Sequence, residues 1–140
     1  MALTPTRSFS IEKVRNLLKG SQTDLRDSQV PTVSVGRRFD AAYDSGFRCA
    51  LALLEATKQE SKGPGHHRES LEYLATTLGL EKTSVGELIP VLVQTRNSQR
   101  YDAVTSITEN MVKATVEWAL RVQSETEAWF QKNLPQALKA

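Results

Sequence analysis

Apolar residues recur along this chain at spacings of three and four, which is the period of an α-helix, and no segment alternates convincingly between apolar and polar residues. The periodic segments predict five helices, over about residues 10–27, 39–60, 67–78, 84–96 and 106–133. Short polar connections make successive helices antiparallel. The pattern therefore predicts an all-α fold, an up-and-down bundle of four to five helices.

The second predicted helix has the clearest apolar face, and the fifth is unusually long. The face of the second helix is formed by Phe39, Ala42, Tyr43, Gly46, Cys49, Ala50, Leu53 and Leu54. Several of these residues are small, so another helix can approach closely. The apolar face of the fifth helix is formed by Ile107, Met111, Ala114, Trp118 and Val122. That helix would be roughly 40 Å long, with Trp129 at its far end as spare apolar surface. Both features favour a homodimer.

Short motifs mark where helices begin and end. Capping boxes at Ser84–Glu87 and Ser106–Glu109 predict the starts of the fourth and fifth helices. Gly79 is a natural C-cap for the third helix, and Pro135 helps to end the fifth. Pro90 lies one turn into the fourth helix, where it is tolerated or bends the helix.

Composition narrows the class of protein. The chain has 140 residues, about one domain, with a core over about residues 8–130. The net charge of +2 is too small to predict nucleic-acid binding from overall electrostatics. The single cysteine, Cys49, is expected to be a small buried residue. No segment resembles a signal peptide or approaches the roughly 20 apolar residues of a membrane span, so a cytoplasmic protein without a membrane association is expected.

Polar side chains concentrate after the apolar run 88–93, in the segment Arg96-Asn97-Ser98-Gln99-Arg100-Tyr101. Such a cluster is costly beside a core unless it has a function. The antiparallel connection places the start of the third helix beside the end of the fourth. One end of the bundle should therefore collect Gly65, His66, His67, Arg68, Arg96, Asn97, Arg100, Tyr101 and the N-terminus of the fifth helix. Partial positive charge at helix N-termini makes this end a plausible anion or phosphate site.

The ordered set Arg38–Asp44, Gly65–Arg68 and Arg96-Asn97-x-x-x-Tyr101 resembles the HEPN superfamily of small helical bundles. The resemblance implies a four- or five-helix bundle, usually a homodimer, in prokaryotic toxin–antitoxin or defence systems. In active members a motif of Arg, four to six residues and His faces its counterpart across the dimer and cleaves RNA without a metal. Arg96 and Asn97 would match the start of that motif.

Tyr101 occupies the position of the motif's histidine, and no histidine follows it. With a reference pKa of about 10, roughly one tyrosine in a thousand is ionised at pH 7, so Tyr101 is a poor base. His66 or His67 titrates in the right range to be a relocated base. The family also includes members that do not cleave RNA and act as binding or partner modules.

Three functions therefore remain open. The first is an HEPN-like dimeric module that binds RNA or a nucleotide with weak or no ribonuclease activity. Its residues at the catalytic position would be Arg96, Asn97 and Tyr101, and its ligand-binding residues would be His66, His67, Arg68 and Arg100. The second is a metal-independent endoribonuclease toxin restrained by a protein partner such as an antitoxin.

The third function is a non-catalytic interaction module in which the polar cluster is structural. In that case Arg96 would pair with Asp44, Glu69 or Asp102, Asn97 would be a C-cap, and Tyr101 would pack between helices. Asp40 and Asp44 lie one turn apart and would pair with Arg37, Arg48 or a base of the first helix, or bind a cation. No cofactor is predicted, and one cysteine with two adjacent histidines does not give a tetrahedral metal site.

Overall fold

The computed structural model describes the backbone of residues 3–5, 9–102 and 106–139 and the side chains of residues 9–100 and 106–139. The described residues form five α-helices: α1 (Ile11–Asp27), α2 (Val35–Ala56), α3 (His66–Leu78), α4 (Ser84–Asn97) and α5 (Glu109–Asn133). A π-helical turn, η1 (Ser98–Asp102), extends α4, and a 3₁₀ turn, η2 (Pro135–Leu138), follows α5. The predicted all-α helical bundle is confirmed.

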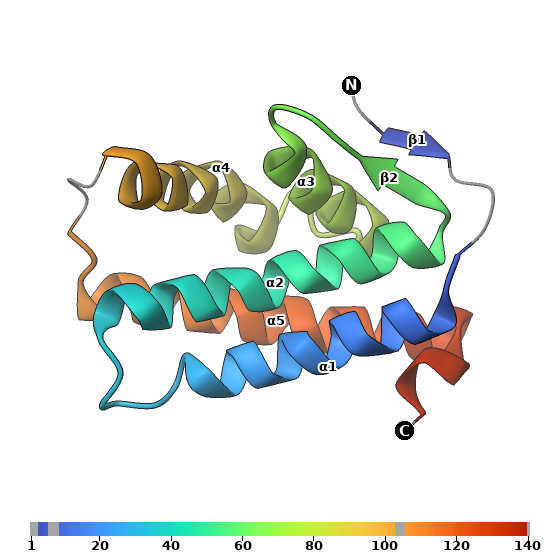
Figure 1. Cartoon of the computed structure of the whole chain (residues 1–140), viewed down its shortest axis with the longest axis horizontal. Helices are drawn as coiled ribbons and strands as arrows, with labels where there is room; N and C mark the ends of the chain where they lie inside the picture. The colour runs from blue at the N-terminus through green and yellow to red at the C-terminus, as the bar shows by residue number, and fades with distance from the viewer. Residues whose placement is uncertain (1–2, 6–8, 103–105, 140) are drawn as a thin grey trace.

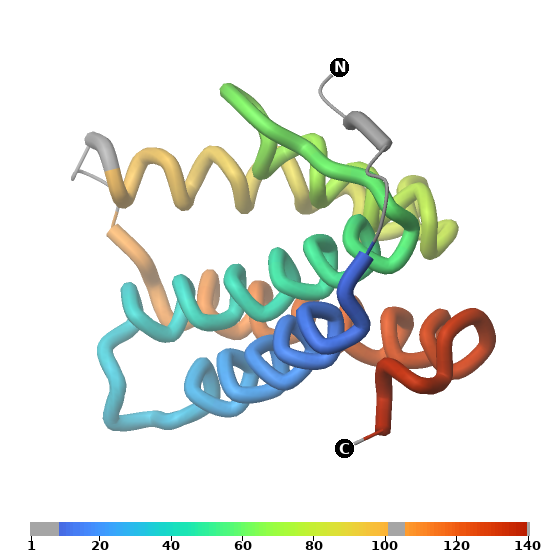
Figure 2. Tube along the Cα trace, turned by 45° about the vertical axis from the view of Figure 1, so that its right-hand side comes forward, coloured from blue at the N-terminus to red at the C-terminus, as the bar shows by residue number. Residues whose placement is uncertain are grey.

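Helix α2 is the centre of the bundle. It packs against α1, α3 and α5, with α1 on one side and α3 and α4 on the other (Figures 1 and 2). The whole predicted face of α2 is buried, including Tyr43 and Gly46. No helix in the described part of the chain is both long and apolar enough to cross a membrane.

The small residues of α2 admit α5, as expected. A Cβ added at Gly46 would overlap the ring of Trp118, which is 3% exposed. The Trp118 indole also donates to the Val85 carbonyl at 3.1 Å and so ties α5 to α4. Trp129, expected as spare surface, is partly buried and meets Phe130 edge-on, with ring centroids 5.0 Å apart. The two features that favoured a dimer are therefore accounted for within one chain.

The N-caps predicted at Ser84 and Ser106 are wrong by one and two residues. Thr83 caps α4 by accepting from the Val85 amide, and Thr108 caps α5 by accepting from the Met111 amide. Both threonines have extended backbone dihedrals, which orient their hydroxyls toward those amides. The predicted face of α5 also needs correction, since Ala114 is exposed. The buried positions on α5 are Val112, Thr115, Trp118, Ala119, Val122, Thr126 and Phe130.

A small antiparallel sheet, not predicted from the sequence, pairs β1 (Leu3–Pro5) with β2 (Gln59–Ser61). Strand β2 and the following turn carry the chain back along α2 before α3 begins (Figures 1 and 2). Gly63 and Gly65 both have positive φ in this turn, which favours glycine. As a result, the first residues of α3 lie beside the middle of α2.

Candidate functional site

A cavity of about 270 Å³ lies between the Gly-rich turn, the start of α3 and the end of α4. Its lining residues are Gly63, Pro64, Gly65, His66, His67, Arg68, Val93, Arg96 and Asn97. The structure thus brings together five residues that the sequence placed in one site: His66, His67, Arg68, Arg96 and Asn97. The antiparallel course of α3 and α4 makes this meeting possible.

Arg96 is the cation most closely built into this site. Its guanidinium carbon lies 5.6 Å from the centroid of the Tyr43 ring, a cation–π contact. Its Nε is buried without a hydrogen-bond partner in the described part of the chain, and its Nη1 lies 3.5 Å from Oδ1 of Asn97, which is a long contact. Among the side chains that the structure describes, the ion pairs do not include Arg96. The predicted pairing of Arg96 with Asp44 or Glu69 is not formed, and the side chain of Asp102 lies outside the described residues.

A stack of rings supports the cavity from the side of α2. The His67 ring lies parallel to Phe47, with centroids 4.0 Å apart, and its Nδ1 is 3.1 Å from the Tyr43 hydroxyl. Burial lowers the pKa of His67 to about 4, and nearby Arg96 acts in the same direction. Burial raises the pKa of Tyr43 to about 12. Both groups are therefore uncharged at pH 7.

Tyr43 and Phe47 were not predicted as site residues. Tyr43 was assigned to the core, where it does lie, with 0% exposure. One signal in the sequence could have indicated their role. Tyr43 and Phe47 are four residues apart, and Asp40 and Asp44, also four residues apart, alternate with them. That pattern gives one helix face with both rings and carboxylates.

His66 is held in one orientation by the turn before it. Its Nδ1 lies 3.2 Å from the Gly63 carbonyl oxygen. A carbonyl only accepts hydrogen bonds, so Nδ1 carries the proton and Nε2 of a neutral ring is left as an acceptor. The ring also meets His67 edge-on, with centroids 4.6 Å apart.

Asp40 and Asp44 form the acidic edge of the cluster. Burial raises the pKa of both carboxyls, while Arg100 and Arg96 act to lower them. Oδ1 of Asp40 is buried without a partner. Arg48, expected to pair here, instead binds Asp24 at 3.0 Å.

Three predicted contributors lie elsewhere or outside the described side chains. Arg100 is exposed and does not line the cavity; its charge acts on Asp40 and Asp44. The start of α5 is also separate, because Glu109 pairs with Arg38 and lines a different hollow. Tyr101 belongs to η1, but its side chain lies outside the described residues.

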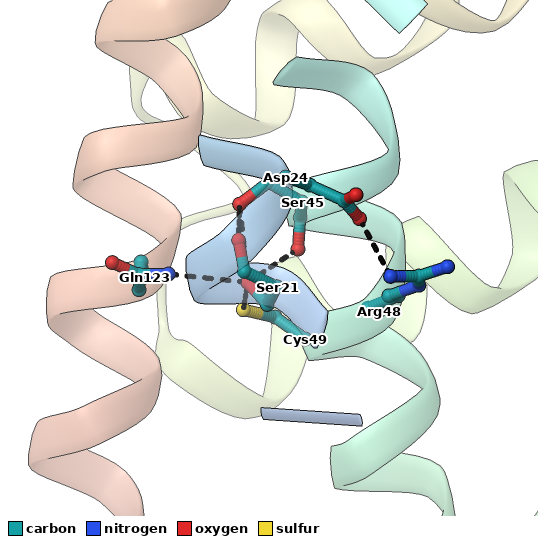
Figure 3. Close-up of polar contacts among 6 residues, drawn as sticks. All are labelled: Ser21, Asp24, Ser45, Arg48, Cys49 and Gln123. Atoms are coloured by element: carbon teal, nitrogen blue, oxygen red, sulfur yellow. Dashed lines mark hydrogen bonds and ion pairs between the residues drawn. The ribbon is translucent and has the colours of Figure 1, made fainter. Parts of the chain in front are cut away.

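A second polar cluster is buried between α1, α2 and α5 (Figure 3). The Ser21 hydroxyl donates to the Ser45 carbonyl at 2.8 Å, lies 3.2 Å from the Cys49 sulfur and accepts from Gln123 at 3.2 Å. Burial raises the pKa of the Cys49 thiol to about 11. Because these groups bond to one another and the thiol is protonated, we assign the cluster to helix packing, as expected for Cys49.

No protein-family model, curated protein or solved structure matches this chain. Among the described residues, no three His, Cys, Asp or Glu side chains are grouped so that they could hold a metal ion.

Proposed function

We propose that the protein is an HEPN-like module that binds RNA or a nucleotide in the cavity between α3 and α4. Arg96 carries the proposal. Arg96 lines the cavity, its Nε is buried without an acceptor among the described residues, and it belongs to none of the ion pairs among the described side chains. A phosphate oxygen is the acceptor that a planar, permanently charged guanidinium binds well.

The rest of the cavity also favours an anion. Its lining includes Arg68 and two histidines but, among the described residues, no carboxylate. The first turn of α3 borders it, and Gly65 at the N-cap has no side chain to bind the free amides of that turn. A helix N-terminus carries partial positive charge and unsatisfied N–H donors, both of which suit a phosphate.

The same geometry favours binding over cleavage. Metal-independent RNA cleavage needs a base for the 2′-hydroxyl proton and a cation for the phosphorane. Arg96 could supply the cation. His67 is a weak base, since its pKa is about 4, and the Tyr43 hydroxyl is protonated, since its pKa is about 12. We therefore expect weak or no ribonuclease activity.

A ribonuclease is the second candidate, and the orientation of His66 favours it. The bond to the Gly63 carbonyl leaves Nε2 of His66 as the acceptor that a general base requires. In this function the chain would be a toxin, with an antitoxin as its protein partner. Either function would fit a homodimer in a defence or toxin–antitoxin system.

The proposal is tested with wild type, Arg96→Ala and Arg121→Ala incubated with labelled RNA in EDTA. Arg121 is a matched control because it lies on the exposed surface of α5, paired with Glu125. We expect binding by fluorescence anisotropy that Arg96→Ala weakens and Arg121→Ala retains, without cleavage products on gels. If wild type cleaves the RNA and both Arg96→Ala and His66→Gln do not, the result would favour the ribonuclease.

A structural role for Arg96 predicts a different result. If the guanidinium only packs on Tyr43, Arg96→Ala should lose roughly 0.5–1 kcal/mol of stability or more, and wild type should not bind RNA. That outcome would favour the interaction module.

A further inference from the structure

A groove of about 650 Å³ opens along the surface of α4 beside the cavity. Its lining residues are Gly65, Arg68, Pro90, Val93, Gln94, Asn97 and Ser98. Gly65, Arg68, Val93 and Asn97 line the cavity as well. A molecule seated at Arg96 can therefore continue along α4 without leaving the surface.

We propose that the ligand is single-stranded RNA whose chain passes from the cavity into this groove, rather than a free nucleotide or a duplex. This inference rests on the proposed function, because it assumes that one phosphate sits at Arg96. It adds the class of ligand and the direction in which the chain leaves the site.

The groove has side chains suited to unpaired nucleotides. Two of its lining residues, Pro90 and Val93, are apolar, and base faces can pack against them. Gln94, Asn97 and Ser98 carry groups that both donate and accept hydrogen bonds, as base edges and 2′-hydroxyls require. None of the described residues that line the groove is acidic.

Arg68 stands where the cavity meets the groove. Its Nε lies 3.2 Å from a Glu72 carboxylate oxygen, and 54% of its side chain is exposed. An exposed ion pair of this kind is weak, so Arg68 can turn to a second phosphate at little cost.

From Pro90 to Ser98 the groove follows α4 for about 12 Å at 1.5 Å per residue.

The alternatives fit less well. A free nucleotide would fill the small cavity and leave the groove unused. A duplex is recognised across a broad face rich in phosphate contacts, whereas Arg68 is the only lysine or arginine among the described residues that line the groove. A single strand uses both hollows.

The test is a competition assay against a labelled single-stranded octanucleotide. The competitors are nucleoside monophosphates, a dinucleotide, a tetranucleotide and a hairpin of the same composition. We expect affinity to rise at least about tenfold, a step of 1.4 kcal/mol, from the monophosphate to the tetranucleotide, with the hairpin stem competing weakly. Equal affinity for monophosphate and tetranucleotide would overturn the inference while leaving the proposed function intact.

Gln94→Glu provides an independent check, because Gln94 is exposed and lines the groove but not the cavity. A carboxylate there should weaken octanucleotide binding several-fold and leave monophosphate binding unchanged. Gln131→Glu, at an exposed position on α5, is the matched control. An unchanged octanucleotide affinity in Gln94→Glu would also overturn the inference. Folded wild-type protein that binds neither RNA nor monophosphate would refute the proposed function itself.

Discussion

Acidification is predicted to destabilise this protein through His67. Burial lowers the pKa of His67 from 6.5 to about 4, so between these values the unfolded chain binds more protons than the folded one. Stability is then complete above pH 6.5 and falls as the pH decreases toward 4. The pKa change corresponds to at most about 3.4 kcal/mol at 1.36 kcal/mol per pH unit. Because the ring is partly exposed, solvent screening reduces this to about 1–2 kcal/mol.

Other charged groups around His67 must be separated from its effect. Arg96, Arg100 and His66 disfavour its charged form. Asp40 and Asp44 have the opposite effect on stability. Because their pKa values are raised in the folded protein, it binds protons before the unfolded chain does, and their contribution to the free energy of unfolding grows as the pH falls. A comparison between variants removes the contributions that they share.

The assay is urea unfolding of wild type and His67→Gln at about pH 7.5, above the transition, and at about pH 4.5, near its lower end. Wild type should lose about 1–2 kcal/mol more than His67→Gln on acidification. His66→Gln, which leaves His67 in place and removes only a smaller contribution to its pKa than burial makes, should keep most of the wild-type acid loss. Equal acid losses in wild type and His67→Gln would refute the reasoning.

Three further predictions concern the core, the thiol and the assembly. Gly46→Ala should destabilise the fold by about 1–3 kcal/mol in urea, because the added methyl displaces Trp118. Gly36→Ala, which meets only the flexible end of Gln99, should be tolerated, and equal stability of the two variants would contradict this account. Cys49 should react with a thiol reagent only after unfolding, since it is 0% exposed; rapid labelling of folded protein would count against its burial. The dimer now rests on the HEPN resemblance alone, because α2 and Trp129 are packed within one chain; sedimentation at micromolar concentration should show it, and a monomer would remove that proposal.

The helices could be predicted from the sequence because an apolar face is a local pattern. Their exact starts could not. Ser84 and Thr83 are both good N-cap residues, and only the backbone conformation decides that the Thr83 hydroxyl reaches the Val85 amide. Strand β2 is three residues long, too short for alternation to show.

The site was partly predictable for a similar reason. The antiparallel connection between the third and fourth helices predicts that His66 and His67 lie near Arg96. Tyr43 and Phe47 could not be predicted as site residues, because aromatic residues at helical spacing are as typical of a hydrophobic core as of a binding site. Only the return of the chain along α2 places His67 on Phe47. Arg100 was misplaced because connectivity brings the end of α4 to the start of α3 but does not decide which way the residues of the following turn, η1, face.

The most direct test of phosphate binding by Arg96 is the salt dependence of single-stranded RNA affinity in wild type and Arg96→Ala. Each phosphate contact with a single strand contributes about 0.7 to the slope of log affinity against log salt concentration. Loss of one contact should therefore lower the slope of Arg96→Ala by about 0.7, while Arg121→Ala keeps the wild-type slope. An Arg96→Ala variant with the wild-type affinity and slope would contradict the claim that this cavity binds a phosphate.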